Sequence, residues 1–367
     1  MLLLRSNLKF ILFLFTFINQ ILLYTNMNIL FYADVHIKDF SSFPPFNETD
    51  SNGLTKELNN TLQGFYFIRD YIDKNDINLV VNLGDTFNNV DTISTKSAYV
   101  AYQGLNAIKT SCESKEIDHL IIVGNHELLN EHKNIHNCSI LNKYSDLVVD
   151  DYIEYTINDL KIALFPYTSN INKAREWIDR GQSSGLICTH QEFSGNKYES
   201  GMFTESKLSP KSKVQIVAGH IHLPQETEDV ICCGSLIQNK FSQYSIFNNG
   251  LLTYDTDTKK FTRVFNNYSK HYVKIKEEDV PNIKNILNPL NSVVQVQVKD
   301  MDNKEHLNQY LKEYKHFIIK KYEHNQKTAL ENKVYSEFNF TDPKMLLNRY
   351  ICDNNENAID VFNEVFR

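Results

Sequence analysis

Residues 28–36 read Asn28-Ile-Leu-Phe-Tyr-Ala-Asp-Val-His36, an apolar run that ends in an aspartate and a histidine. A continuous apolar run of this length is typical of a strand that is buried on both faces, as in a parallel sheet. Downstream, apolar residues recur at steps of three and four, which predicts a helix with one buried face. These residues are Leu54, Leu58, Leu62, Phe65, Ile68 and Ile72. A buried strand followed by an amphipathic helix indicates an α/β fold.

The same alternation continues to about residue 264. Further strands are predicted at 77–83, 119–123, 185–188 and 214–218, with a helix at about 92–109. Residues 154–157 and 161–165 flank an Asn158-Asp159 turn, which predicts a β-hairpin. The stretch from Val230 to about Val264 is rich in strand-forming residues and closes this region.

Polar side chains follow five of the predicted strands. They are Asp34-Val-His36, Gly84-Asp85, Gly124-Asn-His-Glu127, His190 and Gly219-His-Ile-His222. In open α/β sheets, ligands gather outside the carboxyl ends of the strands, so these groups are expected to meet there. The donors are imidazole, carboxylate and amide oxygen without thiolate, which suits Mn, Fe or Zn rather than a structural zinc site. The three glycines are expected to permit tight turns next to the metals.

This ordered set resembles the signature of the calcineurin-like metallophosphoesterases, and the resemblance covers residues 27 to about 240. It implies a four-layer α/β sandwich, in which two β-sheets are flanked by helices. It also implies two divalent metal ions, with Mn²⁺ first and Mg²⁺, Fe²⁺ or Zn²⁺ as alternatives. The implied ligands are Asp34, His36 and His222 for one ion, Asn125, His190 and His220 for the other, and Asp85 as the bridge. His126 is implied as the catalytic residue, beside the scissile phosphate.

Three features favour a nuclease within that superfamily. Leu83-Gly-Asp-Thr-Phe87 resembles the Gly-Asp-x-Phe form of SbcD-type nucleases, and the segments 190–195 and 233–238 resemble nuclease subunits encoded by tailed phages. The third feature is a βαβαβ pattern at about 271–322, where that family carries a DNA-contacting capping domain. The resemblance therefore implies an exonuclease or endonuclease that acts on DNA ends in repair or recombination. One departure is Asn88, where cellular members often carry a histidine, and it puts the balance between the two activities in doubt.

The domain organisation follows from these patterns. We expect a catalytic domain at 27–266 and a small α+β capping domain at 267–325, with strands at 272–276, 292–298 and 316–320. Helices are expected around 283–287 and 305–314. Residues 326–367 are expected to form a linker and a helical tail. By the resemblance, this tail binds an SMC-like ATPase subunit, and the nuclease subunit forms a homodimer.

The first 26 residues are interpreted as an extension outside the core. The apolar run 10–18 follows Arg5 and Lys9, as in a signal peptide, but it is short for a membrane span and precedes no small-x-small cleavage site. We interpret Met27 as the start of translation and expect a cytoplasmic protein (the host cytoplasm if the source is viral), without a membrane partner. A true leader or membrane anchor is the alternative. Six cysteines without a Cys-x-x-Cys pair favour a reduced interior.

The formal net charge of −7 argues against a protein that coats nucleic acid by bulk electrostatics, but not against a nuclease with a local positive field. Candidate phosphate contacts are Lys207, Lys211, Lys213 and Lys240. Other functions fit the same signature less completely. The chain could be a stand-alone metallophosphatase or nucleotide phosphodiesterase, an exported phosphoesterase, or a non-catalytic interaction module.

Overall fold

The computed structural model describes residues 27–39, 49–209, 211–238, 249–286, 292–300 and 305–320. The predicted extension at 1–26 and the predicted linker and tail at 326–367 lie outside these residues. The chain divides into two compact units, Met1–Ile319 and Lys320–Arg367, and the described residues up to Ile319 belong to the first. Within the described ranges, no helix has both the length and the apolar character that crossing a bilayer requires.

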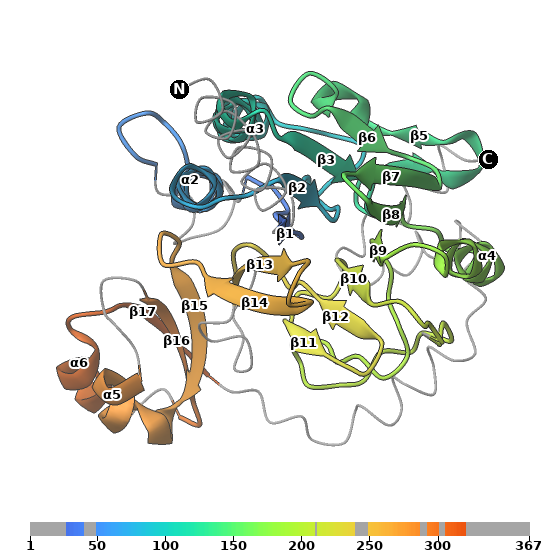
Figure 1. Ribbon diagram of the computed structural model, residues 1–367. Coiled ribbons are helices and arrows are strands. Elements are labelled where there is room, and N and C mark those ends of the chain that lie inside the picture. The colour runs from blue at the N-terminus through green and yellow to red at the C-terminus, as the bar shows by residue number, and fades with distance from the viewer. Residues whose placement is uncertain are drawn as a thin grey trace, which may run out of the picture. The chain divides into compact units, whose positions relative to one another are not determined.

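Two six-stranded sheets form the centre of the region from Asn28 to Phe265 (Figure 1). The first has the order β14-β13-β1-β2-β3-β6, and its strands are β1 (Asn28–Tyr32), β2 (Leu79–Asn82), β3 (Asp118–Ile122), β6 (Leu147–Val149), β13 (Gly250–Asp255) and β14 (Lys260–Phe265). The second has the order β11-β12-β10-β9-β8-β7, and its strands are β7 (Ile153–Ile157), β8 (Leu160–Phe165), β9 (Leu186–Thr189), β10 (Ile216–Ala218), β11 (Gln225–Glu226) and β12 (Val230–Cys232). The central strands of both sheets are parallel. Antiparallel strands lie at both edges of the second sheet and at one edge of the first, whose other edge strand, β6, is parallel to β3.

Helices cover the outer face of each sheet, which makes four layers. Along β1, Ile29 and Phe31 pack into the core between the two sheets, whereas Leu30 and Tyr32 pack under the helices α2 (Lys56–Lys74) and α3 (Thr95–Lys115). The period of two along a strand produces this division. On the far side, Trp177 of α4 (Ile171–Gly181) packs against β8 and β9 (Figure 1). The predicted α/β sandwich of two sheets flanked by helices is confirmed.

Most predicted elements are present, with shifted ends. Helix α2 begins after Thr55, whose side chain accepts the Leu58 N–H, and α3 runs six residues beyond its predicted end. Helix α4 was not predicted, although Asn170 caps it and its buried side chains are spaced at three and four residues. Short elements connect the sheets: β4 (Leu128–Asn130), β5 (Ile135–His136), and 3₁₀ helices at Glu131–Lys133 and Asn137–Leu141.

The predicted βαβαβ order is also present at the C-terminal end of the described chain. It consists of β15 (His271–Lys276), a 3₁₀ turn (Glu277–Asn282) with α5 (Ile283–Ile286), β16 (Ser292–Val298), α6 (Glu305–Leu311) and β17 (Lys315–Lys320). The three strands form a sheet of their own, with β15 parallel to β16, over a separate apolar core. Tyr272 connects this sheet to the region of the two large sheets by two hydrogen bonds. Its O–H donates to Glu57 (2.5 Å), and its N–H donates to Gln238 (2.9 Å).

Candidate metal centre

The sheets bring the predicted site residues to one edge. Asp34 and His36 follow β1, Asp85 follows β2, and Asn125 and His126 follow β3, which are neighbouring parallel strands. His190 follows β9, and His220 and His222 follow β10, which are neighbours in the second sheet. Because the shared core stacks the two sheets, their strand ends converge. All eight predicted residues lie in one cluster. Seven of them form three overlapping groups, and within each group the donor atoms lie within 4.8 Å of one another. The eighth, Asn125, contacts His190 and His220.

The first group contains Asp34, His36 and His222. His36 Nε2 lies 2.9 Å from His222 Nε2 and 3.9 Å from Asp34 Oδ1, so the two imidazoles and the carboxylate face a common point. Asp34 and His36 are buried, and His222 is half-buried. The group therefore opens to solvent on the side of His222.

The second group contains Asp85, His190 and His220, together with Asn125. His190 Nε2 lies 3.1 Å from Asn125 Oδ1, and His220 Nδ1 lies 2.8 Å from the same oxygen. His190 Nδ1 lies 2.7 Å from the Leu83 carbonyl, which can only accept a hydrogen bond. Nδ1 therefore donates to this carbonyl and Nε2 faces the cluster, the orientation that is usual for histidines that bind metals.

Asp85 lies between the two groups. Its Oδ2 is 3.5 Å from His36 Nε2 on one side and 3.3 Å from His190 Nε2 on the other. Its Oδ1 accepts the His126 N–H at 3.0 Å. A carboxylate in this position can contact one cation on each side.

His126 packs edge-on against His36 of the first group. Its ring centroid is 4.6 Å from that of His36, with the two planes at 82°, and the side chain is half-buried. His126 Nδ1 donates to the Asn88 carbonyl at 2.7 Å, which leaves Nε2 for another partner. Asn88 orients His126 through its backbone, while its own side chain donates to Asn89. Replacing histidine with asparagine at this position therefore does not remove the contact.

Glu127 holds two of the loops together, and sequence reasoning gave it no role. Its Oε2 accepts the N–H groups of Gly124 (2.8 Å) and Asp85 (3.0 Å). Its Oε1 accepts those of Phe87 (3.1 Å) and Thr86. Burial raises the pKa of this carboxyl to about 7, and the backbone donors oppose that rise. Glu127 therefore positions both Asp85 and the segment that carries Asn125 and His126.

The backbone of the site is unusual as well. Eight of the described non-glycine residues have positive φ, and four of them are Asp34 (52°), His36 (50°), Asp85 (56°) and His220 (76°). Such conformations are costly for residues with a Cβ, and they persist where the surrounding structure holds them, often at functional sites. Gly124 is required for space, because a Cβ there would lie 2.1 Å from Asp85 Oδ1.

The charges of the cluster fit divalent cations. Burial and the neighbouring charge of Asp85 raise the pKa of Asp34 to about 8, against opposing contributions from His190 and the His220 N–H. Burial raises the pKa of Asp85, but the nearby His190 and His36 lower it further, so that it lies below its ordinary value. Burial lowers the pKa of His36 to about 3, which keeps its imidazole neutral. Burial opposes the charge of His190, but the neighbouring Asp85 raises the pKa of this imidazole to about 9. The donor set contains only oxygen and nitrogen atoms, which matches the ligand preferences of Mn²⁺, Fe²⁺ and Zn²⁺.

Further carboxylates and a tyrosine surround the cluster and were not predicted. Glu192 Oε2 lies 3.6 Å from His220 Nε2, and Glu199 Oε2 lies 3.8 Å from His222 Nδ1. The ring of Tyr167 stacks on His220, with centroids 5.8 Å apart and planes at 24°. Carboxylates on the far nitrogens of metal-binding histidines orient the rings and raise their basicity.

His119 and the candidate phosphate-contact lysines are not among the residues of the cluster. His119 is buried away from the cluster, between the Tyr32 hydroxyl (2.9 Å) and the Tyr144 carbonyl (3.1 Å). The candidate phosphate contacts Lys207, Lys211 and Lys213 are exposed on the loop before β10, and Lys240 lies outside the described residues.

Comparison with known proteins identifies the family of the chain. The family model for calcineurin-like phosphoesterases matches residues 27–234, more than half of the 367-residue chain. Solved structures with a similar fold include a dimetal phosphatase from Danio rerio (11% identity, 62% of this chain and 91% of that chain covered, TM-score 0.35). They also include the nuclease MPE of Pseudomonas putida (14% identity, 64% and 87% covered, TM-score 0.29). No curated protein sequence matches the chain. The chain belongs to the calcineurin-like phosphoesterase family, whose members are metal-dependent hydrolases of phosphoester bonds.

Proposed function

We propose that this protein is a metal-dependent DNA nuclease that hydrolyses phosphodiester bonds with two metal ions. The observation that carries the proposal is the cluster of three donor groups, which overlap through His36 and Asp85. In this proposal Asp34, His36 and His222 would hold one ion and Asn125, His190 and His220 would hold the other, with the Asp85 carboxylate available to both.

Two ions in such a site supply positive charge to the phosphate oxygens and lower the pKa of an attacking water. The residues of the chain supply the geometry. His190 is fixed by the Leu83 carbonyl, and Glu127 fixes the backbone of Asp85, so the donors are preorganised. His126, held by the Asn88 carbonyl, presents Nε2 toward the cluster. From there it can donate a proton to the departing sugar oxygen or a hydrogen bond to the phosphate.

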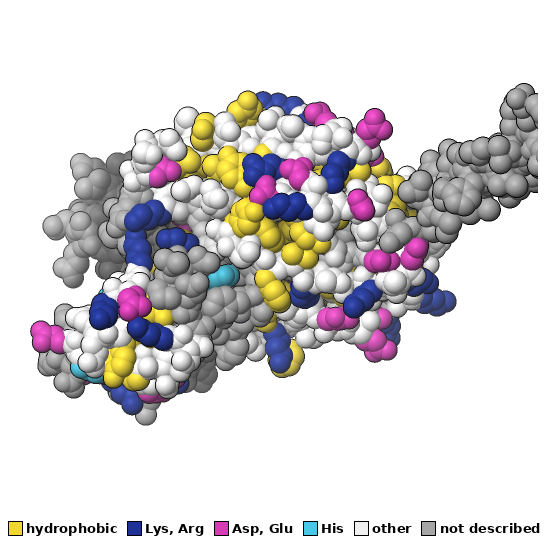
Figure 2. Space-filling model, turned by 60° about the vertical axis from the view of Figure 1, so that its left-hand side comes forward, with side chains coloured by type: hydrophobic (Ala, Val, Ile, Leu, Met, Phe, Trp, Pro, Cys, Tyr) yellow, Lys and Arg dark blue, Asp and Glu magenta, His cyan; other side chains and the backbone are white. Residues whose placement is uncertain are grey.

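A cluster of lysines supports DNA as the substrate. Lys56, Lys270 and Lys315 line a cavity of about 270 Å³ where α2 meets the small sheet. Lys56 is exposed, and contact with Lys315, followed by a small loss of solvation, lowers its pKa to about 8. Amines that crowd one another are stabilised by an anion such as a backbone phosphate. Elsewhere, lysine and arginine side chains are interspersed with acidic ones on the described part of the face in Figure 2. This distribution favours contact of DNA with a local group of lysines over attraction by the charge of the whole surface.

The assignment to DNA-end processing also rests on the 83–87 motif and on the βαβαβ segment, as argued from the sequence. An SMC-like ATPase as partner of the C-terminal tail, and a homodimer, belong to the same proposal. The residues of that tail lie outside the described ranges.

A second candidate function is a stand-alone nucleotide phosphodiesterase or phosphatase. The observation that favours it is a cavity of about 430 Å³ beside the metal centre, which is large enough for a nucleotide. This candidate requires turnover of small phosphoesters with inert DNA.

The test is cleavage of end-labelled linear DNA by the full chain in Mn²⁺, with and without a co-purified ATPase. His126→Ala should lower the cleavage rate by about 10²- to 10⁴-fold while Mn²⁺ binding is retained, because its side chain acts on substrate. The matched control is His132→Ala, an exposed histidine outside the cluster. Wild-type protein that hydrolyses nucleotides but leaves DNA intact would replace the nuclease proposal with the second candidate.

A further inference from the structure

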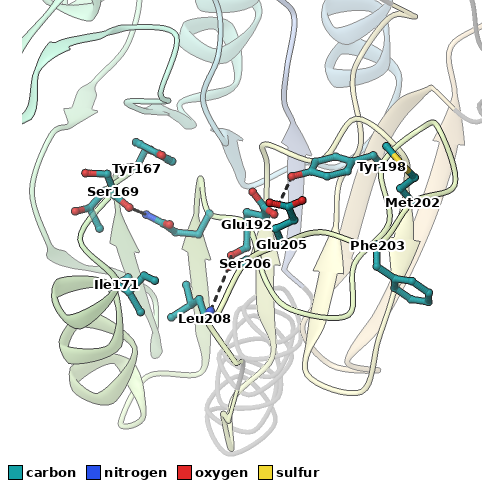
Figure 3. A pocket seen from close by; sticks show the side chains of 13 residues that line it. Tyr167, Ser169, Ile171, Glu192, Tyr198, Met202, Phe203, Glu205, Ser206 and Leu208 are labelled. Atoms are coloured by element: carbon teal, nitrogen blue, oxygen red, sulfur yellow. Dashed lines mark hydrogen bonds between the residues drawn. The ribbon is translucent and has the colours of Figure 1, made fainter. Parts of the chain in front are cut away.

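A cavity of about 430 Å³ lies beside the candidate metal centre, at the same edge of the second sheet (Figure 3). Its walls come from residues 167–169 after β8, from Gln191 and Glu192 after β9, and from the 198–208 segment of the loop that leads to β10. In Figure 3, Tyr167 and Ser169 lie on one side and Tyr198 and Met202 on the other, with Glu192 between them.

The cavity and the metal centre share two residues. Tyr167 lines the cavity and stacks on His220, and Glu192 lines it and lies 3.6 Å from His220 Nε2. A molecule in the cavity is therefore separated from a proposed metal ligand by a single side chain. A phosphate at the metals and a group in the cavity can belong to one nucleotide-sized molecule.

The lining indicates what kind of group fits. Aromatic and apolar side chains are contributed by Tyr167, Tyr198, Phe203, Met202 and Ile171. The charged side chains among the lining residues are the carboxylates of Glu192 and Glu205, and no lysine or arginine is among those described there. This lining disfavours a phosphate and favours a flat, uncharged group that presents N–H donors to carboxylates.

The loop that forms the cavity is held in place by its own hydrogen bonds. The Tyr198 O–H donates to Glu192 Oε1 (2.8 Å), and the Ser206 O–H donates to the Glu192 carbonyl (2.8 Å), as Figure 3 shows for Tyr198. The Ser194 N–H donates to the Leu208 carbonyl (2.9 Å). The cavity is thus formed before a ligand arrives, as is usual for small-molecule sites of roughly 300–1,000 Å³.

We infer that this cavity receives one unpaired nucleobase of the substrate, next to the phosphate that is cleaved. A nucleobase is planar, it stacks on aromatic side chains whatever its identity, and its exocyclic amino groups and ring N–H groups match carboxylate acceptors. A base that is paired and stacked in a duplex cannot enter, so the site selects single-stranded or frayed ends. The inference rests on the proposed phosphodiesterase activity toward nucleic acid and specifies its substrate.

The kinetic test compares two substrates in Mn²⁺. One is a short single-stranded oligonucleotide, and the other is methyl p-nitrophenyl phosphate, a diester without a base. In Tyr198→Leu the ratio of kcat/KM for the oligonucleotide to kcat/KM for the diester should fall about tenfold, the usual size of a lost base–aromatic stack. Tyr198→Phe keeps the ring and should restore the ratio. Tyr99→Leu, an exposed tyrosine on α3, should leave it unchanged. A blunt duplex of the same sequence should be cleaved more slowly than the single strand.

A binding test separates this inference from the proposed function. In an Asp85→Asn background, which should not cleave, an oligonucleotide that ends in 2-aminopurine should lose fluorescence on binding, and Tyr198→Leu should reduce that loss. Absence of quenching together with an unchanged kinetic ratio would overturn the base site while leaving the nuclease intact. Quenching by a wild-type protein that cleaves no phosphodiester would support the base site and contradict the proposed function.

Discussion

Glu127→Gln tests how far the metal centre depends on one buried carboxylate. The two oxygens of Glu127 accept four backbone N–H groups, from Gly124, Asp85, Thr86 and Phe87. Glutamine replaces one oxygen with an NH₂ group that cannot accept, so two buried donors lose their partner. Each unsatisfied buried donor costs about 1–3 kcal/mol, which predicts a loss of roughly 2–6 kcal/mol in the free energy of unfolding. That is a large share of the ~5–15 kcal/mol of a typical domain.

The assay is urea denaturation of the metal-free chain at pH 8, where the Glu127 carboxylate is ionised, followed by Mn²⁺ titration calorimetry. Since Glu127 positions the loops that carry Asp85 and Asn125, Mn²⁺ affinity should fall about 10- to 100-fold. The matched control, Glu176→Gln on the exposed face of α4, should change stability by less than ~0.5 kcal/mol. A Glu127→Gln protein with wild-type stability and wild-type Mn²⁺ affinity would refute the reasoning.

Three further changes have defined outcomes. Gly124→Ala places a Cβ 2.1 Å from Asp85 Oδ1, so Mn²⁺ affinity should fall. An unchanged Mn²⁺ affinity in titration calorimetry would count against tight packing between the loops that carry Gly124 and Asp85. Lys56→Ala should weaken DNA binding at every sequence and reduce the slope of log K against log salt by about one. The difference in affinity between this variant and the wild type should shrink above pH 8, because Lys56 loses its proton there. Equal salt slopes for the two proteins would exclude this contact. Burial lowers the pKa of His119 to about 4, below its unfolded value near 6.5. Between pH 6.5 and 4 only the unfolded chain therefore gains this proton, and the free energy of unfolding should fall by up to about 3 kcal/mol as the pH drops through this range. In His119→Gln the denaturation midpoint should fall less steeply with decreasing pH than in the wild type. An identical pH dependence of the two midpoints would contradict the assignment.

The sequence was sufficient for the fold and for the membership of the cluster. Strands such as 28–32 are predicted by their apolar runs, and consecutive strands such as β1, β2 and β3 are parallel neighbours that helices connect. Since ligands gather at the carboxyl ends of such strands, the residues that follow them could be named without coordinates. Their convergence in the structure depends on the stacking of the two sheets over one core.

The remaining features depend on distances that no local pattern encodes. Glu127 follows His126 in the sequence, but three of its four backbone contacts arise only when the loops after β2 and β3 meet. The cavity beside the metals is built by the 192–208 loop, whose turns and side-chain bonds have no helical or strand period. Glu192 lies directly after His190-Gln191, and its place beside His220 follows from the fold rather than from that spacing. Helix α4 could have been found from its spacing and its Asn170 cap.

The most direct measurement is diffraction from Mn²⁺-soaked crystals at a wavelength where manganese scatters anomalously. We predict two peaks per chain, about 3.5–4 Å apart, with Asp85 in contact with both. One should lie among Asp34, His36 and His222, and the other among Asn125, His190 and His220. A single peak, or ions that bind away from Asp85, would contradict the two-metal account.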